Sequence, residues 1–354
     1  MIGERIRQRR RSRRLSLRAL AEAAGVSAAA ISNYETGKDV PGSSVLLSLA
    51  RALDARVDYF FRSVSVDLGQ PAYRKHCNVS QAKMATLESR VQDMVERYLE
   101  TESLFGEGVP PRFKPPACFE EQVSDIDEVE RKAEALREHW SIGGDAIDNL
   151  TELLEDWGIK VIYVDEDEGF DGCAYPDGDA PVIVVNGRKP GDRLRFDLAH
   201  ELGHLLLTFP DDWDDKRRES AAHRFAGALL VPRSAAIMEL GKKRGTISLL
   251  ELYSLKHKYG MSMQAWIHRA SDLNIISAYA SRRLWALFAR RGWKRLEPEE
   301  EYPREHSRRQ ERLVARAYAD HIISESRAAE LLAKPLHEYA QMLATDEQAR
   351  ASAT

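Results

Sequence analysis

The sequence has few cysteines and no long apolar run. Its 354 residues include three cysteines, Cys77, Cys118 and Cys173, which lie far apart. Isolated thiols argue against a disulfide framework and against a thiolate metal site, and they favour a reducing compartment. No uncharged apolar stretch approaches the roughly 20 residues that span a bilayer, and no apolar leader follows the basic N-terminus. We therefore expect a cytoplasmic protein with no membrane partner.

Charge is distributed unevenly along the chain. Residues 1–63 hold twelve Lys and Arg against six Asp and Glu, a net charge of +6, whereas the whole chain has a net charge of −4. Seven arginines fall within "RIRQRRRSRR" alone. A basic first domain on an acidic body predicts that only this end of the protein meets a polyanion.

The first sixty residues contain the helix-capping and turn residues that are typical of a helix-turn-helix domain. Ser16 is placed to cap one helix, Gly25 to end it, and Ser27 to cap a second helix that reaches about Thr36. Further helices at "SSVLLSLARALD" and "VDYFF" complete a small five-helix core. We predict a DNA-binding domain over residues 1–63. The alternative for the domain is an ordinary small helical bundle, and the alternative for the arginine run is a solvated helix face.

This segment resembles the Xre (lambda-repressor-like) helix-turn-helix family from Met1 to Phe61, in "LA..AGVS...IS..E.GK..P". The resemblance implies a homodimer on a double-stranded DNA operator. One departure is Leu17, where the family often has Gln. Another is the alanine-rich start of the recognition helix, because alanine cannot hydrogen-bond a base edge. We therefore expect phosphate contacts to dominate binding. The expected DNA contacts are Arg5, Arg9, Arg13, Ser27, Ala28, Ala29, Ser32 and Asn33.

The rest of the chain is predicted to be mainly helical with a small β-sheet, which places the protein in the α+β class. Residues 64–115 form a connector with an amphipathic helix at "AKMATLESRVQDMVERYLE", which we expect to pack on the body of the protein rather than to pair with a second subunit. Residues 116–276 form that body, with strands at "IKVIYV" and "PVIVVN" separated by turn-rich sequence. An edge strand there is suited to hold an extended peptide. Residues 277–354 are expected to be a helical packing or sensing region with a disordered tail, although "ISESRAAELLAKPLHEYAQML" also imitates a helix-turn-helix.

The segment "RFDLAHELGHLLL" has metal-binding spacing. His200 and His204 are four residues apart and therefore share one face of a helix, where imidazole nitrogens suit Zn²⁺. Glu201 is placed to act as a general base on a water molecule. The alternative is a pair of core histidines that bind no metal.

A second helix, "KRRESAAHRFAGALLVP", is predicted to supply the third ligand. Glu219 lies fifteen positions after His204, and the intervening loop is long enough to return the chain to the same ion. His223 shares the face of Glu219 as a supporting residue, an oxyanion donor, an alternative ligand or a surface residue. The aspartates of "DDWDD" form a solvated loop in our interpretation. The candidate oxyanion donors are His223, Tyr175 and His257.

From about Asp127 to Ile276 the chain resembles the ImmA/IrrE family of zinc metallopeptidases, since "RFDLAHELGHLLL" is followed by "E...A..FAGALLVP". The resemblance implies zinc on His200, His204 and Glu219, with Glu201 as general base. The family often has Asn at the position of His223. The resemblance also implies cleavage of a helix-turn-helix repressor in a stress or mobile-element response.

Several functional hypotheses are compatible with the sequence. The cleaved protein is either a partner repressor or the chain itself, in its linker near Val64 to Lys83. A different class of function is a repressor or antitoxin-type protein whose metal domain is a sensor or scaffold. A nuclease has little support, because the sequence has no clustered carboxylates suited to two metals.

Overall fold

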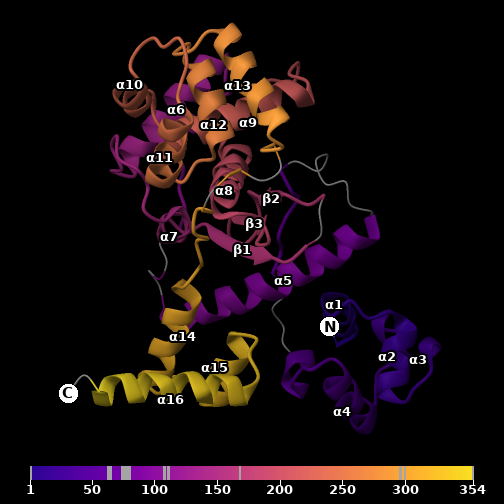
Figure 1. Cartoon of the computed structure of the whole chain (residues 1–354). Coiled ribbons are helices and arrows are strands. Elements are labelled where there is room, and N and C mark those ends of the chain that lie inside the picture. Colours follow the sequence, from indigo (N-terminus) through magenta and orange to yellow (C-terminus); the bar gives the residue numbers. More distant parts are fainter. Residues whose placement is uncertain are drawn as a thin grey trace. The chain divides into compact units, whose positions relative to one another are not determined.

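The computed structural model describes residues 2–352 except 62–65, 73–80, 107–108, 110–111, 167–168, 295–296 and 299. Within these residues no helix combines the length and apolarity needed to cross a membrane. The fold is mainly helical with one three-stranded sheet, which confirms the expected α+β class (Figure 1). The chain divides into two compact units, and the C-terminal region is shared between them. We call Met1–Leu68, Asn78–Val109 and Arg308–Thr354 the N-terminal unit, and Gly69–Cys77 and Pro110–Ser307 the central unit.

The N-terminal unit is entirely helical where it is described. Its elements are α1 (Ile2–Ser12), α2 (Leu17–Ala24), α3 (Ala28–Glu35), α4 (Ser43–Ala52), the 3₁₀ helix η1 (Val57–Phe61), α5 (Gln81–Ser103), α14 (Arg309–Ala319), α15 (Glu325–Leu331) and α16 (Leu336–Ser352).

Local capping forms the helix-turn-helix as predicted. The Ser16 side chain accepts a hydrogen bond from the Ala19 amide at the start of α2, and Ser27 does the same with Ala30 at the start of α3. Gly25 ends α2 in the left-handed conformation with φ 69°, which glycine adopts without strain. The helices then enclose a core that includes Ile6, Leu20, Ile31, Leu49 and Phe60.

The amphipathic helix and the C-terminus differ from the sequence prediction. Helix α5 packs on α1 in the N-terminal unit, and α14 and α15 pack on α5. Helix α16 continues to Ser352, where we expected a disordered tail. Its last turns contain Glu, Gln, Ala and Arg, which favour helix. The expected connector, residues 64–115, includes the undescribed residues 73–80, among them Cys77.

The central unit surrounds the small sheet with helices. Its elements are η2 (Ala117–Phe119), α6 (Ile126–His139), α7 (Leu150–Asp156), β1 (Lys160–Val164), β2 (Gly172–Tyr175), β3 (Val182–Asn186), α8 (Gly191–Leu206), α9 (Asp215–Leu230), α10 (Arg233–Leu240), α11 (Leu249–Tyr259), α12 (Met263–Asp272) and α13 (Ala278–Arg290).

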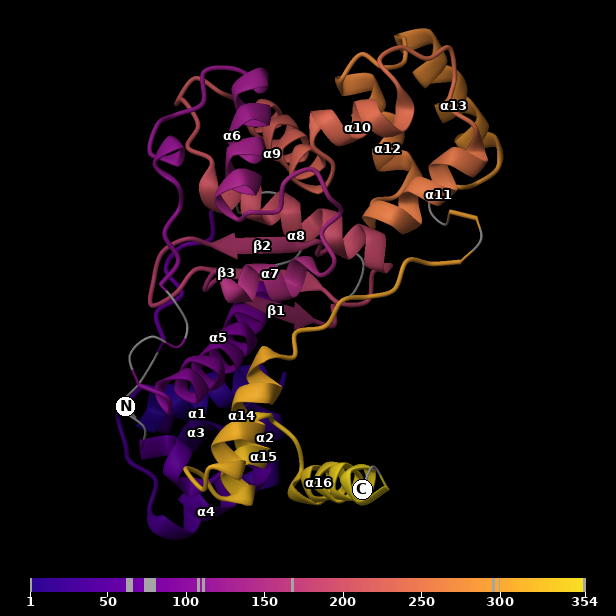
Figure 2. The ribbon, with the colours of Figure 1, turned by 90° about the vertical axis from the view of Figure 1, so that its left-hand side faces the viewer.

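The sheet has the order β1-β3-β2, with β1 parallel and β2 antiparallel to β3. Helix α8 packs on β2 and β3, and α9 packs on α8 and α6 (Figure 2). The sequence predicts β1 and β3 but not β2, whose residues fall in the stretch interpreted as turn. "GCAY" is short and begins with glycine, so its strand conformation depends on pairing with β3 rather than on local propensity.

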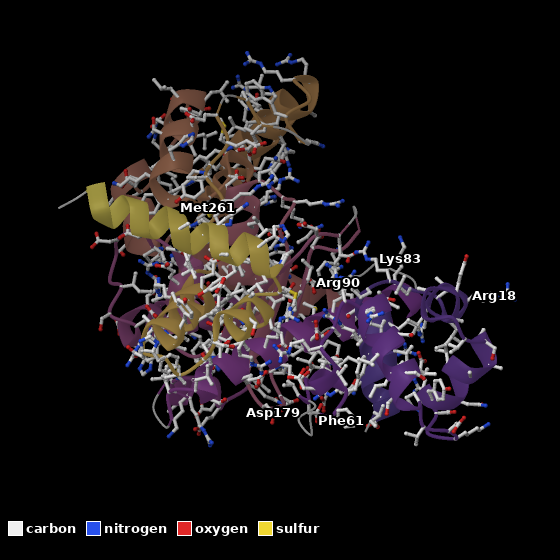
Figure 3. All side chains as sticks on the ribbon, turned by 90° about the horizontal axis from the view of Figure 1, so that it is seen from below. Arg18, Phe61, Lys83, Arg90, Asp179 and Met261 are labelled. Carbon is white, nitrogen blue, oxygen red and sulfur yellow. The ribbon has the colours of Figure 1, made fainter. Side chains whose placement is uncertain are left out.

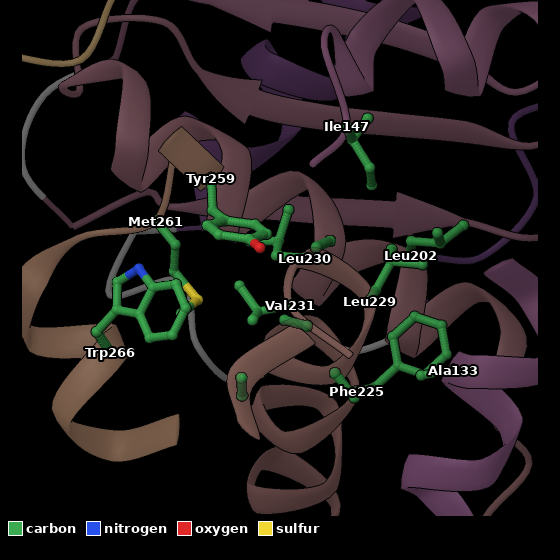
Figure 4. Close-up of a cluster of buried hydrophobic side chains, with 14 of the residues drawn as sticks. Ala133, Ile147, Leu202, Phe225, Leu229, Leu230, Val231, Tyr259, Met261 and Trp266 are labelled. Carbon is green, nitrogen blue, oxygen red and sulfur yellow. The ribbon is translucent and has the colours of Figure 1, made fainter. Parts of the chain in front are cut away.

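One apolar core joins the helices of the central unit. Leu202 of α8, Phe225 and Leu229 of α9 and Trp266 of α12 are all fully buried (Figure 4). Because α8 and α9 are fixed by this core, the polar residues that they carry are held at defined separations.

Candidate metal centre and nucleic-acid interface

Helix α8 brings the two histidines of "HELGH" together. The Nε2 atoms of His200 and His204 are 3.1 Å apart. Both histidines are at most partly exposed, with His204 only 9% accessible. The predicted shared face is therefore present, and both imidazoles point to one place.

Helix α9 brings Glu219 to the same place. One carboxylate oxygen lies 3.2 Å from His200 Nε2, and the other lies 3.1 Å from His204 Nε2. The close approach of the two helices depends on Gly203, where an added Cβ would lie 3.1 Å from the Phe225 ring. The absence of a side chain at Gly203 thus sets the separation between the histidines and the carboxylate.

The donor set fits a zinc ion. Ligand atoms about 2.0–2.2 Å from tetrahedral zinc lie about 3.3 Å from one another. Here the two imidazole nitrogens are 3.1 Å apart, and each lies 3.1–3.2 Å from a different oxygen of the Glu219 carboxylate. Two imidazoles and one carboxylate are also a donor set that zinc accepts at a catalytic site. His200, His204 and Glu219 would hold the ion.

Glu201 is buried beside this cluster, with 8% exposure. Its burial raises its pKa well above the ordinary value, and the charges of Asp197 and Glu219 raise it further. A carboxylate with a raised pKa accepts a proton more readily than an exposed glutamate. Asp197, one turn earlier on α8, is paired with Lys189 at 2.5 Å. Burial raises the pKa of Asp197 to about 6, although Lys189 opposes the shift.

Sequence reasoning missed Gly172 of β2, which borders Glu201, the candidate general base. An added Cβ on Gly172 would lie 3.0 Å from Cγ of Glu201 and 2.9 Å from the Val184 carbonyl oxygen. Any larger residue would push against both atoms. In the sequence, Gly172 is a glycine within a stretch interpreted as turn, and such a glycine does not indicate a contact with a distant residue.

Of the candidate oxyanion donors, His223 is the one that the structure places against the candidate zinc ligands. Its ring centroid lies 4.4 Å from that of His200. Donor atoms of His200, Glu219 and His223 also lie within 4.8 Å of one another, a looser set than the one with His204. Desolvation, followed by the charge of His200, lowers the pKa of His223 to about 4, although the residue keeps solvent access. A neutral imidazole there can donate one hydrogen bond.

Tyr175 and His257 are not brought to this cluster. Side chains alternate along a strand, so Tyr175 lies on the face of β2 opposite to Gly172 and Glu201. The ring of His257 contacts Tyr253 and Tyr302. Neither residue is therefore placed to act as an oxyanion donor at this cluster.

Removing the carboxylate of α9 is expected to weaken metal binding. Glu219→Ala leaves two histidine ligands, so zinc affinity should fall at least about 100-fold, the upper range for losing only a supporting hydrogen bond. Competition with a chromophoric chelator measures this loss.

The matched control is Asp212→Ala in the exposed acidic loop, which should leave zinc affinity unchanged. Full zinc binding by Glu219→Ala would contradict the assignment. If His223→Ala alone lost zinc, the looser ligand set would replace ours.

The structure changes the expected roles of the α1 arginines. Arg5 is 3% exposed and donates two hydrogen bonds of 2.5 Å to Glu96 of α5. Arg9 pairs with Asp93 at 2.8 Å. Acidic residues of α5 neutralise both guanidinium groups. Arg5 therefore forms an internal ion pair rather than the predicted DNA contact, and Arg9 is also held in an ion pair. Arg13 pairs with the exposed Asp54 and keeps access to solvent.

The predicted recognition surface is more open. Ser27, Ala29 and Asn33 are exposed on and before α3, and Ala28 and Ser32 are partly exposed. Arg18 at the start of α2 is also exposed, and its side chain extends outward in Figure 3. Arg18 was not among the expected DNA contacts, because no sequence signal sets it apart from the denser arginine run before it.

Comparisons with known proteins identify two regions. Residues 2–58 match a family described as helix-turn-helix domain. Residues 154–271 match the M78 peptidase family, described as IrrE N-terminal-like domain.

Curated relatives match about a fifth of the chain. A helix-turn-helix-type transcriptional regulator of Sinorhizobium fredii is 39% identical over 74 residues, which cover 20% of this chain and 52% of that protein. A transcriptional regulator in the ATPase CF(0) region of Rhodospirillum rubrum is 38% identical over 20% of this chain and 65% of its own length. Repressor protein C2 of Salmonella phage P22 is 37% identical over 22% of this chain and 34% of its own length. The matches thus span from a third to just under two thirds of these relatives.

Proposed function

We propose that this helix-turn-helix regulator with a domain of the M78 peptidase family is a zinc-dependent endopeptidase that cleaves a repressor partner or its own chain. The observation that carries the proposal is the convergence of His200, His204 and Glu219, with donor atoms 3.1–3.2 Å apart, beside the buried Glu201. Three protein ligands leave one position of a tetrahedral ion for water or substrate.

The residues of this site have separate tasks in peptide hydrolysis. When bound, zinc would polarise the peptide carbonyl and lower the pKa of a water molecule. Glu201 takes a proton from the attacking water and delivers it to the leaving amine, so that the amine departs uncharged. His223 is positioned to donate a hydrogen bond to the oxygen on which negative charge develops. The outer edge of β2 offers main-chain groups to an extended substrate.

The experiment that tests the proposal follows cleavage by mass spectrometry. The zinc-loaded protein is incubated alone and with any helix-turn-helix repressor encoded beside its gene. Discrete fragments that disappear after chelation and return with zinc would support the peptidase. Intact partners and intact chain, with zinc bound, would favour the alternative that this domain is a sensor or scaffold.

We also propose that residues 1–63 bind a double-stranded DNA operator as a homodimer, and that residues 116–276 carry the peptidase. Repressor relatives support the DNA-binding assignment. Joining the two activities raises the local concentration of peptidase around an operator-bound target. This arrangement suits a cytoplasmic regulator that acts in a stress or mobile-element response.

Two substitutions on the exposed helix-turn-helix surface should affect DNA binding differently. Asn33→Ala is expected to weaken specific binding by about 1–3 kcal/mol, because Asn33 is the exposed residue of α3 suited to a bidentate base contact. Arg18→Ala should weaken binding to all sequences and reduce the salt slope by about 1. Electrophoretic mobility shifts at several salt concentrations, with operator and random DNA, separate the two effects. Equal loss on both DNAs with Asn33→Ala would contradict its role in base recognition.

A further inference from the structure

A segment of the chain itself lies on the outer edge of β2. Because β2 ends the sheet, one of its edges is left for another strand. The Ala72 amide donates a hydrogen bond of 2.8 Å to the Ala174 carbonyl oxygen, while Ala174 is in register with Ile183 of β3 on the other side. Main-chain hydrogen bonding to a sheet edge is how extended peptides are bound by strand addition.

A second contact gives the direction of this segment. Gly69 lies so close to Asp177 that an added Cβ would be 2.9 Å from the Asp177 Cβ. Its φ of +68° is also a conformation that other residues rarely adopt. Gly69 thus meets Asp177, whereas Ala72 meets Ala174 three residues earlier. The segment Gly69–Ala72 therefore runs antiparallel to β2.

This edge leads to the general base. Two residues from Ala174, the position of Gly172 lies 3.0–3.1 Å from the Glu201 side chain, measured from an added Cβ. An extended peptide added to β2 in the same antiparallel register would pass along the strand that borders Glu201. The segment Gly69–Ala72 consequently occupies part of the edge that such a peptide requires.

We infer that Gly69–Ala72 is an internal competitor for the peptide-binding edge of β2, and that a substrate must displace it. The edge accepts an extended segment without charged side chains, here Gly-Gln-Pro-Ala. Gln70 and Ala72 are exposed, so the segment can leave the edge without opening the core. The functional meaning of the competition depends on the proposed peptidase, but the binding event does not.

The test measures peptide binding rather than cleavage. A fluorescent peptide with the sequence Asp67–Ala72 is titrated into the full-length, zinc-loaded Glu201→Gln protein, and binding is followed by anisotropy. Ala72→Pro removes the amide donor, so the labelled peptide should bind about fivefold more tightly, as expected for one lost competing hydrogen bond. Gly69→Ala should tighten binding at least as much, because its Cβ collides with Asp177.

Matched controls separate release of the segment from general strain. Gly143→Ala introduces a side chain at a similar φ of +62° with no atom within 4 Å of the new Cβ, and it should leave peptide affinity unchanged. Ala72→Ser keeps the amide and should also be neutral. Failure of the peptide to bind any variant, or equal affinities for Gly69→Ala and Gly143→Ala, would overturn the inference. Tighter binding without any cleavage by the wild type would leave the inference standing and remove the peptidase. Cleavage by the wild type with unchanged peptide affinities would do the reverse.

Discussion

Glu201→Gln is expected to reduce peptide cleavage by about 10²- to 10⁴-fold, the range for removing a general base. The amide of glutamine has nearly the shape of the carboxylate but cannot take a proton from water. Zinc binding should persist, because the three proposed ligands are His200, His204 and Glu219. The rate is measured from fragment formation, and zinc content from metal analysis of the same sample.

The matched control for this variant is Glu120→Gln, which makes the same chemical change at an exposed position of the central unit. It should retain wild-type cleavage. Unchanged cleavage by Glu201→Gln would move the base function to another residue, whereas lost zinc would show that Glu201 supports the ion rather than the proton transfer.

The features predicted from sequence are those with local signals. Caps at Ser16 and Ser27 fix helix starts within one turn, so the helix-turn-helix can be predicted from adjacent residues. The spacing of His200 and His204 fixes their common face, because the period of the helix is known. Glu219 could be proposed for a similar reason. The loop between the two predicted helices is long enough to bring the second helix back to the histidines of the first.

The features that escaped prediction depend on distant pairing. Arg5 looks like a phosphate contact in sequence, but Glu96, which neutralises it, lies 91 residues away on α5. Gly172 gains its importance only when β2 pairs with β3 and approaches Glu201 of α8. Neither the Arg5–Glu96 contact nor the Gly172–Glu201 contact is indicated by the local sequence pattern. Both arise from the packing of segments that are far apart in the sequence.

The largest stability effect is expected at Glu130 of α6, which is 2% exposed. Its carboxylate accepts hydrogen bonds from Arg224 of α9 at 2.5 Å and from Arg269 of α12 at 2.8 Å. Glu130→Gln removes the negative charge that these two buried guanidinium groups share, although Arg224 keeps a longer contact of 3.5 Å with Asp272. The free energy of unfolding should fall by about 3–5 kcal/mol, as for other broken buried ion pairs. Urea denaturation near neutral pH measures the change, and the exposed Glu138→Gln on the same helix should change stability by less than about 0.5 kcal/mol.

The pH dependence of this difference has a definite sign. Burial alone raises the pKa of Glu130, but the hydrogen bonds and charges of Arg269 and Arg224 outweigh it, so the pKa is lowered from 4.5. The stabilisation is therefore complete above 4.5 and is lost as the pH falls through the lowered value. The gap between wild type and Glu130→Gln should shrink over that acidic range, and a gap independent of pH would contradict the ion-pair explanation. Since Arg224 lies on the helix that carries Glu219, the variant should also bind zinc more weakly near neutral pH, which would link the buried charge cluster to the geometry of the metal site.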